Sequence, residues 1–244
     1  MPSLSAEQKL ERRIKSRFQK AIYDYGLVDD GDKILVGLSG GKDSLCLLDL
    51  LAERQKITKP DFSVEALHIR MSNIKYESDI SYLQDFTESR GVRFHLVTTG
   101  FDASTDSRKS PCFLCSWNRR KQMFLKAQEL GCNKIALGHH MDDIIHTAMM
   151  NMFFQGSFST MPVRLNMRKM PLTIIRPLCL EVENDLRQYA LNCRYRKQIK
   201  LCPYETNSHR SDMRNMFSHI ETLNNEARYS VWTALEKEGK LIEE

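Results

Sequence analysis

A short apolar run followed at once by a glycine-rich turn restricts the fold of this chain more than any other feature. The run is KILVGLS at 33–39, and the turn is SGGKDS at 39–44. The run shows no alternation of polar and apolar residues, which is typical of a strand buried on both faces of a helix-covered parallel sheet. The segment at 43–56, DSLCLLDLLAERQK, is predicted to be a helix. Together they predict a strand–turn–helix unit.

The same alternation continues along the chain. Further strands are predicted at 62–70, 92–99 and 133–138, and further helices at 80–90, 117–131 and 142–155. Strands that alternate with helices indicate βαβ units and an α/β fold with a doubly wound parallel sheet. We therefore predict an N-terminal helix within residues 1–30, a nucleotide-binding α/β domain at 31–160, and a C-terminal extension at 161–244.

Composition limits the function classes. No apolar run approaches the roughly 20 residues that span a bilayer, and the N-terminus is charged where a secretion signal would be apolar. We expect a cytoplasmic protein without a membrane partner. In that reducing compartment, seven cysteines are not expected to form a disulfide framework, so metal binding or redox chemistry is predicted for any clustered pair. The net charge of +5 permits an RNA partner without requiring one.

The glycine turn has the composition of a phosphate site. Its glycines let the backbone approach a ligand closely, and the amides that begin the next helix, with the positive end of the helix dipole, favour phosphate oxygens. The pattern is neither GxxxxGKS nor GxGxxG. A tight turn with only a structural role is the alternative. The predicted phosphate-binding residues are Ser39, Gly40, Gly41, Lys42, Asp43 and Ser44.

Two more strand ends carry polar residues. His68 ends the predicted strand at 62–70, and GHHMDD at 138–143 follows the strand at 133–138. Ligands of doubly wound sheets bind beyond the carboxyl ends of the strands, although His68 could equally be a packed strand-end residue. A carboxylate there can hold Mg²⁺, act as a base or orient an attacking oxygen. One of Asp142 and Asp143 is expected only to cap a helix.

Three cysteines are candidate metal ligands. Cys112 and Cys115 form a CxxC after Pro111, in a predicted loop that opens a helix, where two thiolates can bind one metal centre. Cys202, in KLCPYE, is the third. A zinc site or a redox pair remains an alternative use of a CxxC. The remaining cysteines are expected to be core or incidental residues: Cys46, Cys132, Cys179 and Cys193.

These motifs together resemble a known family. SGGKDS after a buried strand resembles the pyrophosphate loop of the PP-loop ATPases, which cleave ATP to AMP and pyrophosphate and adenylylate a substrate oxygen. With GHHMDD and the following NMFFQG, the likeness is to the tRNA 2-thiocytidine synthetase branch, over about residues 30–205. The resemblance implies an adenine nucleotide α-hydrolase-like fold. It also implies that ATP binds near His68, Gly138 and His139, with adenine at the second strand.

The resemblance also implies an iron–sulfur cluster. In this branch and in the related 2-thiouridine synthetases, a CxxC and one later cysteine hold a 4Fe–4S cluster, here Cys112, Cys115 and Cys202. One iron without a protein ligand could then carry sulfide, and zinc is the alternative metal. The 2-thiocytidine enzymes usually have a second CxxC where CPYE has only Cys202. This segment looks more like the 2-thiouridine synthetases, whose zinc fingers are absent here, so the target base stays open.

The implied activity is thiolation of tRNA. ATP with Mg²⁺ would adenylylate a base carbonyl, and sulfide would then displace AMP. Arg119 would bind an ATP phosphate or stabilise negative charge at the reacting centre. Basic residues suited to RNA phosphates are Arg119, Arg120, Lys121, Arg164, Arg168, Lys169, Arg187, Arg194, Arg196, Lys197 and Lys200.

Several alternatives stay open. The sulfur donor could be a cysteine desulfurase or free sulfide, and the oligomeric state, a homodimer included, is not given by the sequence. A non-catalytic nucleotide-binding redox sensor with a zinc or iron–sulfur site is a rival function. A PP-loop amide ligase such as a lysidine synthetase is another, although it would not need the three cysteines.

The glycine turn gives the first testable prediction. If its hydroxyls and amides hold pyrophosphate, Ser39→Ala and Gly41→Val should each abolish AMP formation from ATP while the fold survives. AMP release is measured chromatographically, and circular dichroism checks folding. A Gly41→Val variant with full activity would exclude this assignment.

Overall fold

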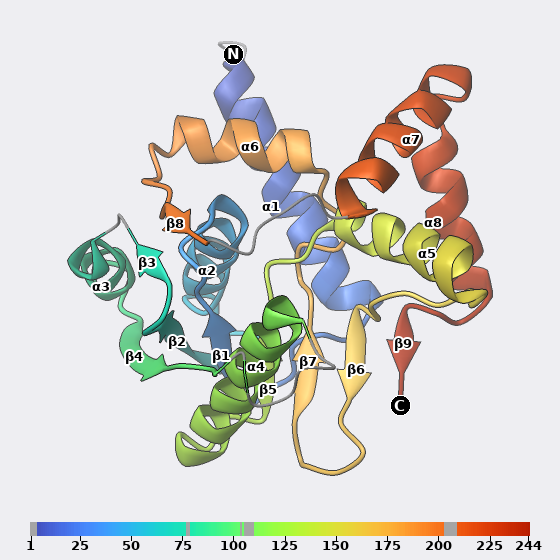
Figure 1. The fold of residues 1–244 in the computed structure, drawn as a ribbon. Helices are drawn as coiled ribbons and strands as arrows, with labels where there is room; N and C mark the ends of the chain where they lie inside the picture. Colours follow the sequence, from blue (N-terminus) through green and yellow to red (C-terminus); the bar gives the residue numbers. More distant parts are fainter. Residues whose placement is uncertain (1–3, 77–78, 103, 105–109, 203–208) are drawn as a thin grey trace.

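A mostly parallel sheet forms the centre of the computed structural model, which describes residues 4–76, 79–102, 104, 110–202 and 209–244. Its seven strands lie in the order β4-β2-β1-β5-β7-β6-β9, and only β6 and β7 pair antiparallel (Figure 1). The predicted α/β fold is thus confirmed. The strands are β1 (Asp32–Gly37), β2 (Phe62–Met71), β4 (Arg93–Thr99), β5 (Lys134–Ala136), β6 (Arg164–Asn166), β7 (Thr173–Ile175) and β9 (Ile242–Glu243).

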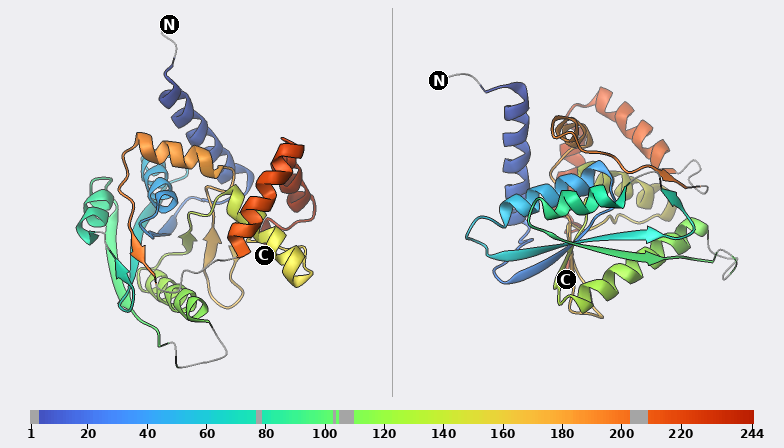
Figure 2. Two further views of the ribbon diagram at one scale, coloured as in Figure 1. Left: turned by 45° about the horizontal axis from the view of Figure 1, so that its top comes forward. Right: turned by 90° about the vertical axis from the view of Figure 1, so that its left-hand side faces the viewer.

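Helices cover both faces of this sheet. Figure 2 shows α2 and α3 on one face and α4 on the other, while Figure 1 shows α5, α7 and α8 grouped at one side. α6 packs against both α1 and α2. The helices are α1 (Ala6–Asp24), α2 (Lys42–Arg54), α3 (Ile80–Glu88), α4 (Pro111–Glu129), α5 (Met141–Gln155), α6 (Glu183–Asn192), α7 (His209–Leu223) and α8 (Ala227–Lys237).

The central strand β1 separates two hydrophobic cores. Ile34 and Val36 belong to the larger core, and Leu35 points to the second core, which includes Ala127 of α4. All of them are fully buried. β1 pairs with β2 on one side and with β5 on the other. The strand order therefore reverses at β1, which is where a doubly wound sheet opens a ligand crevice at its carboxyl edge.

The helix that carries the CxxC begins earlier than the sequence analysis predicted. α4 starts at Pro111, not at Trp117, so Cys112 and Cys115 lie within its first turns and not in a loop before it. Ser110 caps the helix by accepting a hydrogen bond from the amide of Phe113 at 3.2 Å. Serine at the N-cap followed by proline is a favoured helix start, and it explains the earlier beginning.

The sheet continues beyond the boundary predicted near residue 160. β6 and β7 come from the segment MPVRLNMRKMPLTIIRPL, in which no strand was predicted, and both extend the central sheet. A separate antiparallel pair joins β3 (Lys75–Tyr76) to β8 (Lys200–Leu201). The division into 31–160 and 161–244 remains an interpretation of the sequence. No helix of the described part has the length and apolarity that a membrane crossing requires.

One buried carboxyl stands out between α1 and α5. Glu181 is fully buried, and its backbone carbonyl accepts a hydrogen bond from the amide of Met141 at 2.9 Å. Among the described residues, neither carboxyl oxygen has a hydrogen-bond partner, although Arg17 forms an ion pair at 3.7 Å. Burial raises the pKa of Glu181 to about 8, against the opposing charge of Arg17.

This carboxyl predicts a pH-dependent stability. The folded chain prefers the protonated form, so the contribution of Glu181 is full below the unfolded value of 4.5 and is lost as the pH rises towards 8. Glu181→Gln should therefore stabilise the fold at pH 8 by about 1–3 kcal/mol and gain little at pH 4.5. Urea unfolding at both pH values measures the difference, with Glu11→Gln at an exposed site as the control. An equal effect of Glu181→Gln at both pH values would contradict this assignment.

Candidate functional site

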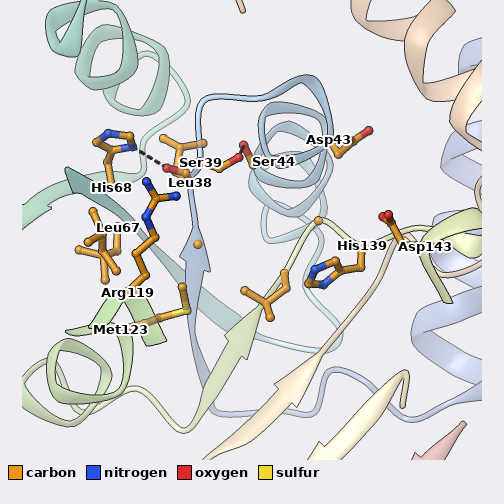
Figure 3. Close-up of a pocket in the computed structure, with 14 residues that line it drawn as sticks. Leu38, Ser39, Asp43, Ser44, Leu67, His68, Arg119, Met123, His139 and Asp143 are labelled. Carbon is orange, nitrogen blue, oxygen red and sulfur yellow. Dashed lines mark hydrogen bonds between the residues drawn. The ribbon is translucent and has the colours of Figure 1, made fainter. Parts of the chain in front are cut away.

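A cavity of about 330 Å³ opens at the carboxyl ends of β1, β2 and β5 (Figure 3). The glycine turn, the end of β2, the start of α5 and one face of α4 all contribute to it. The structure thus brings predicted site residues from four segments to one place, while their roles remain predictions. The lining residues are Gly37, Leu38, Ser39, Asp43, Ser44, Leu67, His68, Ile69, Arg119, Met123, Leu137, Gly138, His139 and Asp143.

Hydrogen bonds hold the glycine turn in shape. The hydroxyls of Ser39 and Ser44 lie 3.1 Å apart, and the amide of Gly41 donates to Ser39 Oγ at 3.3 Å. Gly40 has φ +80°, a conformation that favours glycine. Gly41 has φ −80° and is the N-cap of α2, with no side-chain cap bond among the described residues. The first amides of α2 are therefore not occupied by a capping side chain, which fits a phosphate ligand.

Gly138 brings the GHHMDD segment into direct contact with this turn. A Cβ built on Gly138 would lie 3.0 Å from both the carbonyl carbon of Asp43 and the amide nitrogen of Ser44. Both atoms belong to the backbone, so neither can move aside cheaply. A side chain at 138 would push the end of β5 away from the start of α2, so glycine favours this close packing.

His68 is fixed at the end of β2. Its ring is buried, and Nδ1 donates to the carbonyl oxygen of Leu38 at 2.7 Å (Figure 3). A neutral ring with Nδ1 protonated leaves Nε2 as an acceptor. The amide of Leu38 in turn donates to the carbonyl of Leu67 at 2.8 Å. His68 thus ties the first two strand ends together while it lines the cavity, and its contact with a nucleotide remains a prediction.

The helix α4 connects the CxxC with the cavity. Arg119 extends from α4 towards the side of the cavity where Leu38 and His68 lie, and Met123 follows one turn later (Figure 3). Cys115 precedes Arg119 by four residues, which is about 6 Å along a helix and on the same face. One rigid element therefore carries both a predicted metal ligand and a predicted phosphate ligand.

The two aspartates of GHHMDD have different surroundings. Asp143 lines the cavity and accepts a hydrogen bond from the amide of His140 at 3.3 Å. Asp142 instead accepts from the amide of Glu183 at 2.8 Å and pairs with Arg228. Although burial opposes ionisation, the hydrogen bond from His140 and the charge of Arg228 hold the pKa of Asp142 well below its usual range. The geometry therefore gives Asp142 a structural place at the start of α6.

The two histidines of the motif are also held in place. The Nε of Arg176 donates to His139 Nδ1 at 3.3 Å. His140 is buried, which lowers its pKa, but the hydrogen bond with Asp142 and the charge of Asp143 outweigh burial, and the net shift is upward. The sequence analysis did not name Arg176, Arg228 or Glu183, and no local signal marks them, because each contacts the motif from a distant segment.

Two of the three predicted metal ligands lie at the margin of the second core. Cys115 and Cys202 are half-buried and pack against that core, while Cys112 is exposed on the first turn of α4. Cys202 directly follows β8, the strand that pairs with β3. Within the residues that the structure describes, no three histidine, cysteine, aspartate or glutamate side chains are arranged to hold a metal ion. The donor set still has the chemistry of an iron–sulfur ligand set, and the assignment stays a prediction.

The other cysteines have different settings. Cys46, Cys132 and Cys179 are buried, and burial raises the pKa of each thiol, in Cys132 to about 11. Buried thiols of this kind are poor metal ligands, because metals bind the thiolate. Cys193 is exposed after the end of α6.

The predicted basic residues do not share one environment. Arg164 donates to the carbonyls of Tyr25 and Gly26, at 3.2 and 3.4 Å, and so ties β6 to the turn that follows α1. Arg120 and Lys121 are exposed on α4. Arg164 is occupied by backbone carbonyls, whereas the exposed members of the set remain candidates for RNA phosphates: Arg120, Lys121, Arg168, Lys169, Arg187, Arg194, Arg196 and Lys197.

Comparison with known proteins agrees with this geometry. The PP-loop domain model matches residues 6–218, which is most of the chain. The chain belongs to the PP-loop family. The family likeness expected from SGGKDS and GHHMDD is thereby confirmed.

Two curated relatives of this PP-loop protein carry the same name. The tRNA-cytidine(32) 2-sulfurtransferase of Dechloromonas aromatica (strain RCB) is 34% identical over 234 residues, covering 94% of this chain and 81% of that protein. The protein of the same name from Saccharophagus degradans (strain 2-40 / ATCC 43961 / DSM 17024) is 38% identical over 186 residues, covering 75% of this chain and 59% of its own length. The chain therefore spans about three fifths of that second relative.

A solved structure shares the fold. The U34-tRNA thiolase NcsA from Methanococcus maripaludis, solved with its [4Fe-4S] cluster, superposes with a TM-score of 0.80 and 24% sequence identity. The match covers 95% of this chain and 79% of that chain. The adenine nucleotide α-hydrolase-like fold is thereby confirmed for this PP-loop protein.

The two aspartates predict unequal effects of matched substitutions. Asp142→Asn should destabilise the fold by about 1–3 kcal/mol, because Arg228 loses an ionised partner. The pKa of Asp142 is lowered, so this contribution is present at neutral pH and disappears in acid, where the two proteins should converge. Asp143→Asn should leave stability nearly unchanged and lower AMP formation at least about tenfold. Urea unfolding and AMP release measure the two effects, and equal losses in both variants would contradict the division.

Proposed function

We propose that this chain is an ATP-dependent tRNA thiolase that forms 2-thiocytidine. One observation carries the proposal: α4 begins with Cys112 and Cys115 and presents Arg119 to the cavity one turn later. One helix then carries a residue for each of the two steps, activation of the base and insertion of sulfur. Exposed Arg120 and Lys121 on the same helix suit contact with tRNA phosphates.

In the first step, ATP lies with its phosphates on the glycine turn. The amides at the start of α2 and the hydroxyls of Ser39 and Ser44 bind phosphate oxygens. The carboxylates of Asp43 and Asp143, which both line the cavity, would hold a Mg²⁺ ion that offsets the negative charge of the phosphates. The base carbonyl oxygen attacks the α-phosphorus, the bond to pyrophosphate breaks, and the base becomes an O-adenylyl ester.

In the second step, sulfide attacks the base carbon and AMP leaves with the former carbonyl oxygen. Arg119 stabilises the negative charge of the departing AMP phosphate. Cys112, Cys115 and Cys202 would hold a 4Fe–4S cluster, and three ligating cysteines would leave it able to provide sulfide for this step. We assign the source of that sulfide to a cysteine desulfurase or to free sulfide, and the activity to the reducing cytoplasm.

The target base rests on the relatives. Their name, tRNA-cytidine(32) 2-sulfurtransferase, favours cytidine. One observation favours uridine as the second candidate, since CPYE has only Cys202 where a second CxxC would be expected. Mass spectrometry of tRNA nucleosides from cells with and without this protein tests the proposal. Loss of 2-thiocytidine is the expected result, loss of 2-thiouridine would change the base, and unchanged nucleosides would refute thiolation.

A non-catalytic redox sensor predicts a different behaviour. Such a protein would bind ATP without cleaving it. The thiolase should release AMP in a single turnover that depends on tRNA. Absence of this RNA-dependent AMP would favour the sensor.

The cysteines predict a coloured, oxygen-sensitive protein. Anaerobically purified protein should be brown and absorb broadly at about 400 nm, because thiolates ligate iron. Replacing Cys112, Cys115 or Cys202 by alanine should each bleach the colour and stop thiolation, while ATP binding persists at its separate site. Optical spectra, iron analysis and a thiolation assay measure these effects.

The matched control is Cys193→Ala, because Cys193 is exposed and lies outside the proposed set. It should keep colour and activity, as should alanine at Cys46, Cys132 and Cys179. Stoichiometric zinc without iron, in a protein that works in air, would show a closed structural site instead.

A further inference from the structure

The C-terminal part of the chain crosses the glycine turn at Gln198, a residue outside the SGGKDS and GHHMDD segments. Gln198 lies between α6 and β8, and its side chain is 5% exposed. Its amide donates to the carbonyl oxygen of Gly40 at 3.0 Å. The backbone of this segment is therefore bonded to the phosphate turn itself.

The Gln198 side chain packs on the same glycine. A Cβ built on Gly40 would lie 2.2 Å from Gln198 Oε1 and 2.7 Å from its Cβ. Gly40 also has φ +80°. Glycine at 40 is thus required twice, by the backbone conformation and by the side chain that covers it.

The carboxamide of Gln198 has no hydrogen-bond partner in the described part of the chain. Both its oxygen and its nitrogen are buried, and neither is bonded. Buried side-chain amides are nearly always bonded, because burying an unpaired amide is costly. A buried amide on a turn whose neighbouring helix amides suit phosphate points to a partner that is a ligand.

We propose that Gln198 is a phosphate-binding residue, whose carboxamide NH₂ donates to a phosphate oxygen of the nucleotide on the glycine turn. The proposal rests on the nucleotide site of the proposed function. It adds a donor that comes from the C-terminal segment and not from SGGKDS. Phosphate oxygens are the acceptors that this donor would meet, because the first amides of α2 converge on the same turn.

The same contact links the nucleotide to the cysteine segment. Two residues after Gln198 the chain enters β8, which pairs with β3 in the register Lys75 with Leu201, and Cys202 follows at once. A phosphate bound to Gln198 therefore holds residues 198–202 against the turn. Nucleotide binding should then restrict access to Cys202.

The test uses the full chain without a cluster and titration calorimetry with a non-hydrolysable ATP analogue and with adenosine. Gln198→Met keeps the side-chain volume and removes the donor. It should weaken binding of the ATP analogue about tenfold, which equals about 1.4 kcal/mol of binding free energy, and leave the affinity for adenosine unchanged. Gln198→Glu should weaken the analogue further, because a carboxylate repels phosphate. The two variants differ in shape and charge, so a folding defect in one leaves the other informative.

A second readout follows Cys202. Its alkylation by iodoacetamide, located by mass spectrometry, should slow at least about threefold when the wild type binds the analogue, and should not slow in Gln198→Met. Three results would each overturn the inference. Gln198→Met could bind the analogue as tightly as the wild type does, or it could lose as much affinity for adenosine as for the analogue. Alternatively, alkylation of Cys202 in the wild type could fail to slow when the analogue binds. A wild type that binds no ATP analogue would instead refute the proposed function, and this inference with it.

Discussion

The nucleotide site depends on a backbone contact between Gly138 and the first residues of α2. At this contact the end of β5 and the start of α2 lie so close that a Cβ at 138 would be 3.0 Å from backbone atoms. Because β1 lies between β2 and β5, the parallel pairing brings both strand ends to the same edge. The cavity is therefore fixed by the sheet and one glycine, and the side chains that line it need only project from that frame.

A buried ionic network holds the other side of this frame. Asp142 accepts a hydrogen bond from the amide of Glu183 at the start of α6 and forms an ion pair with Arg228 of α8. Arg228 also forms an ion pair with Glu221 of α7 at 2.8 Å. Three C-terminal helices are thus fixed by one carboxylate at the start of α5. The cost of removing both charges from water offsets much of their attraction, so the intact network fixes positions more than it adds net stability, although removing one partner still destabilises the fold. It also explains how two adjacent aspartates serve different purposes.

The sequence predicted those features that arise from neighbouring residues. The buried run at 33–39 and the strand–helix alternation predicted β1, α2 and the parallel sheet, and the motifs predicted which strand ends line the cavity. The earlier start of α4 was also readable locally, from Ser110 and Pro111. The contact of Asp142 with Arg228 and that of Gln198 with Gly40 could not be predicted, because the two residues of each pair lie far apart in the sequence. β6 and β7 are only three residues each, too short for a periodicity to be recognised.

The helix α4 fixes the spacing between the predicted cysteine ligands and the cavity. Cys115, Arg119, Met123 and Ala127 recur every four residues and so lie along one face. Ala127 is fully buried in the second core, and Met123 packs against that core while it lines the cavity. The lower part of the helix is therefore held by packing. Since a helix is rigid over three turns, this packing also sets the distance from Cys115 to the cavity. In the proposed reaction, a base activated beside Arg119 would therefore lie about one helical turn from Cys115.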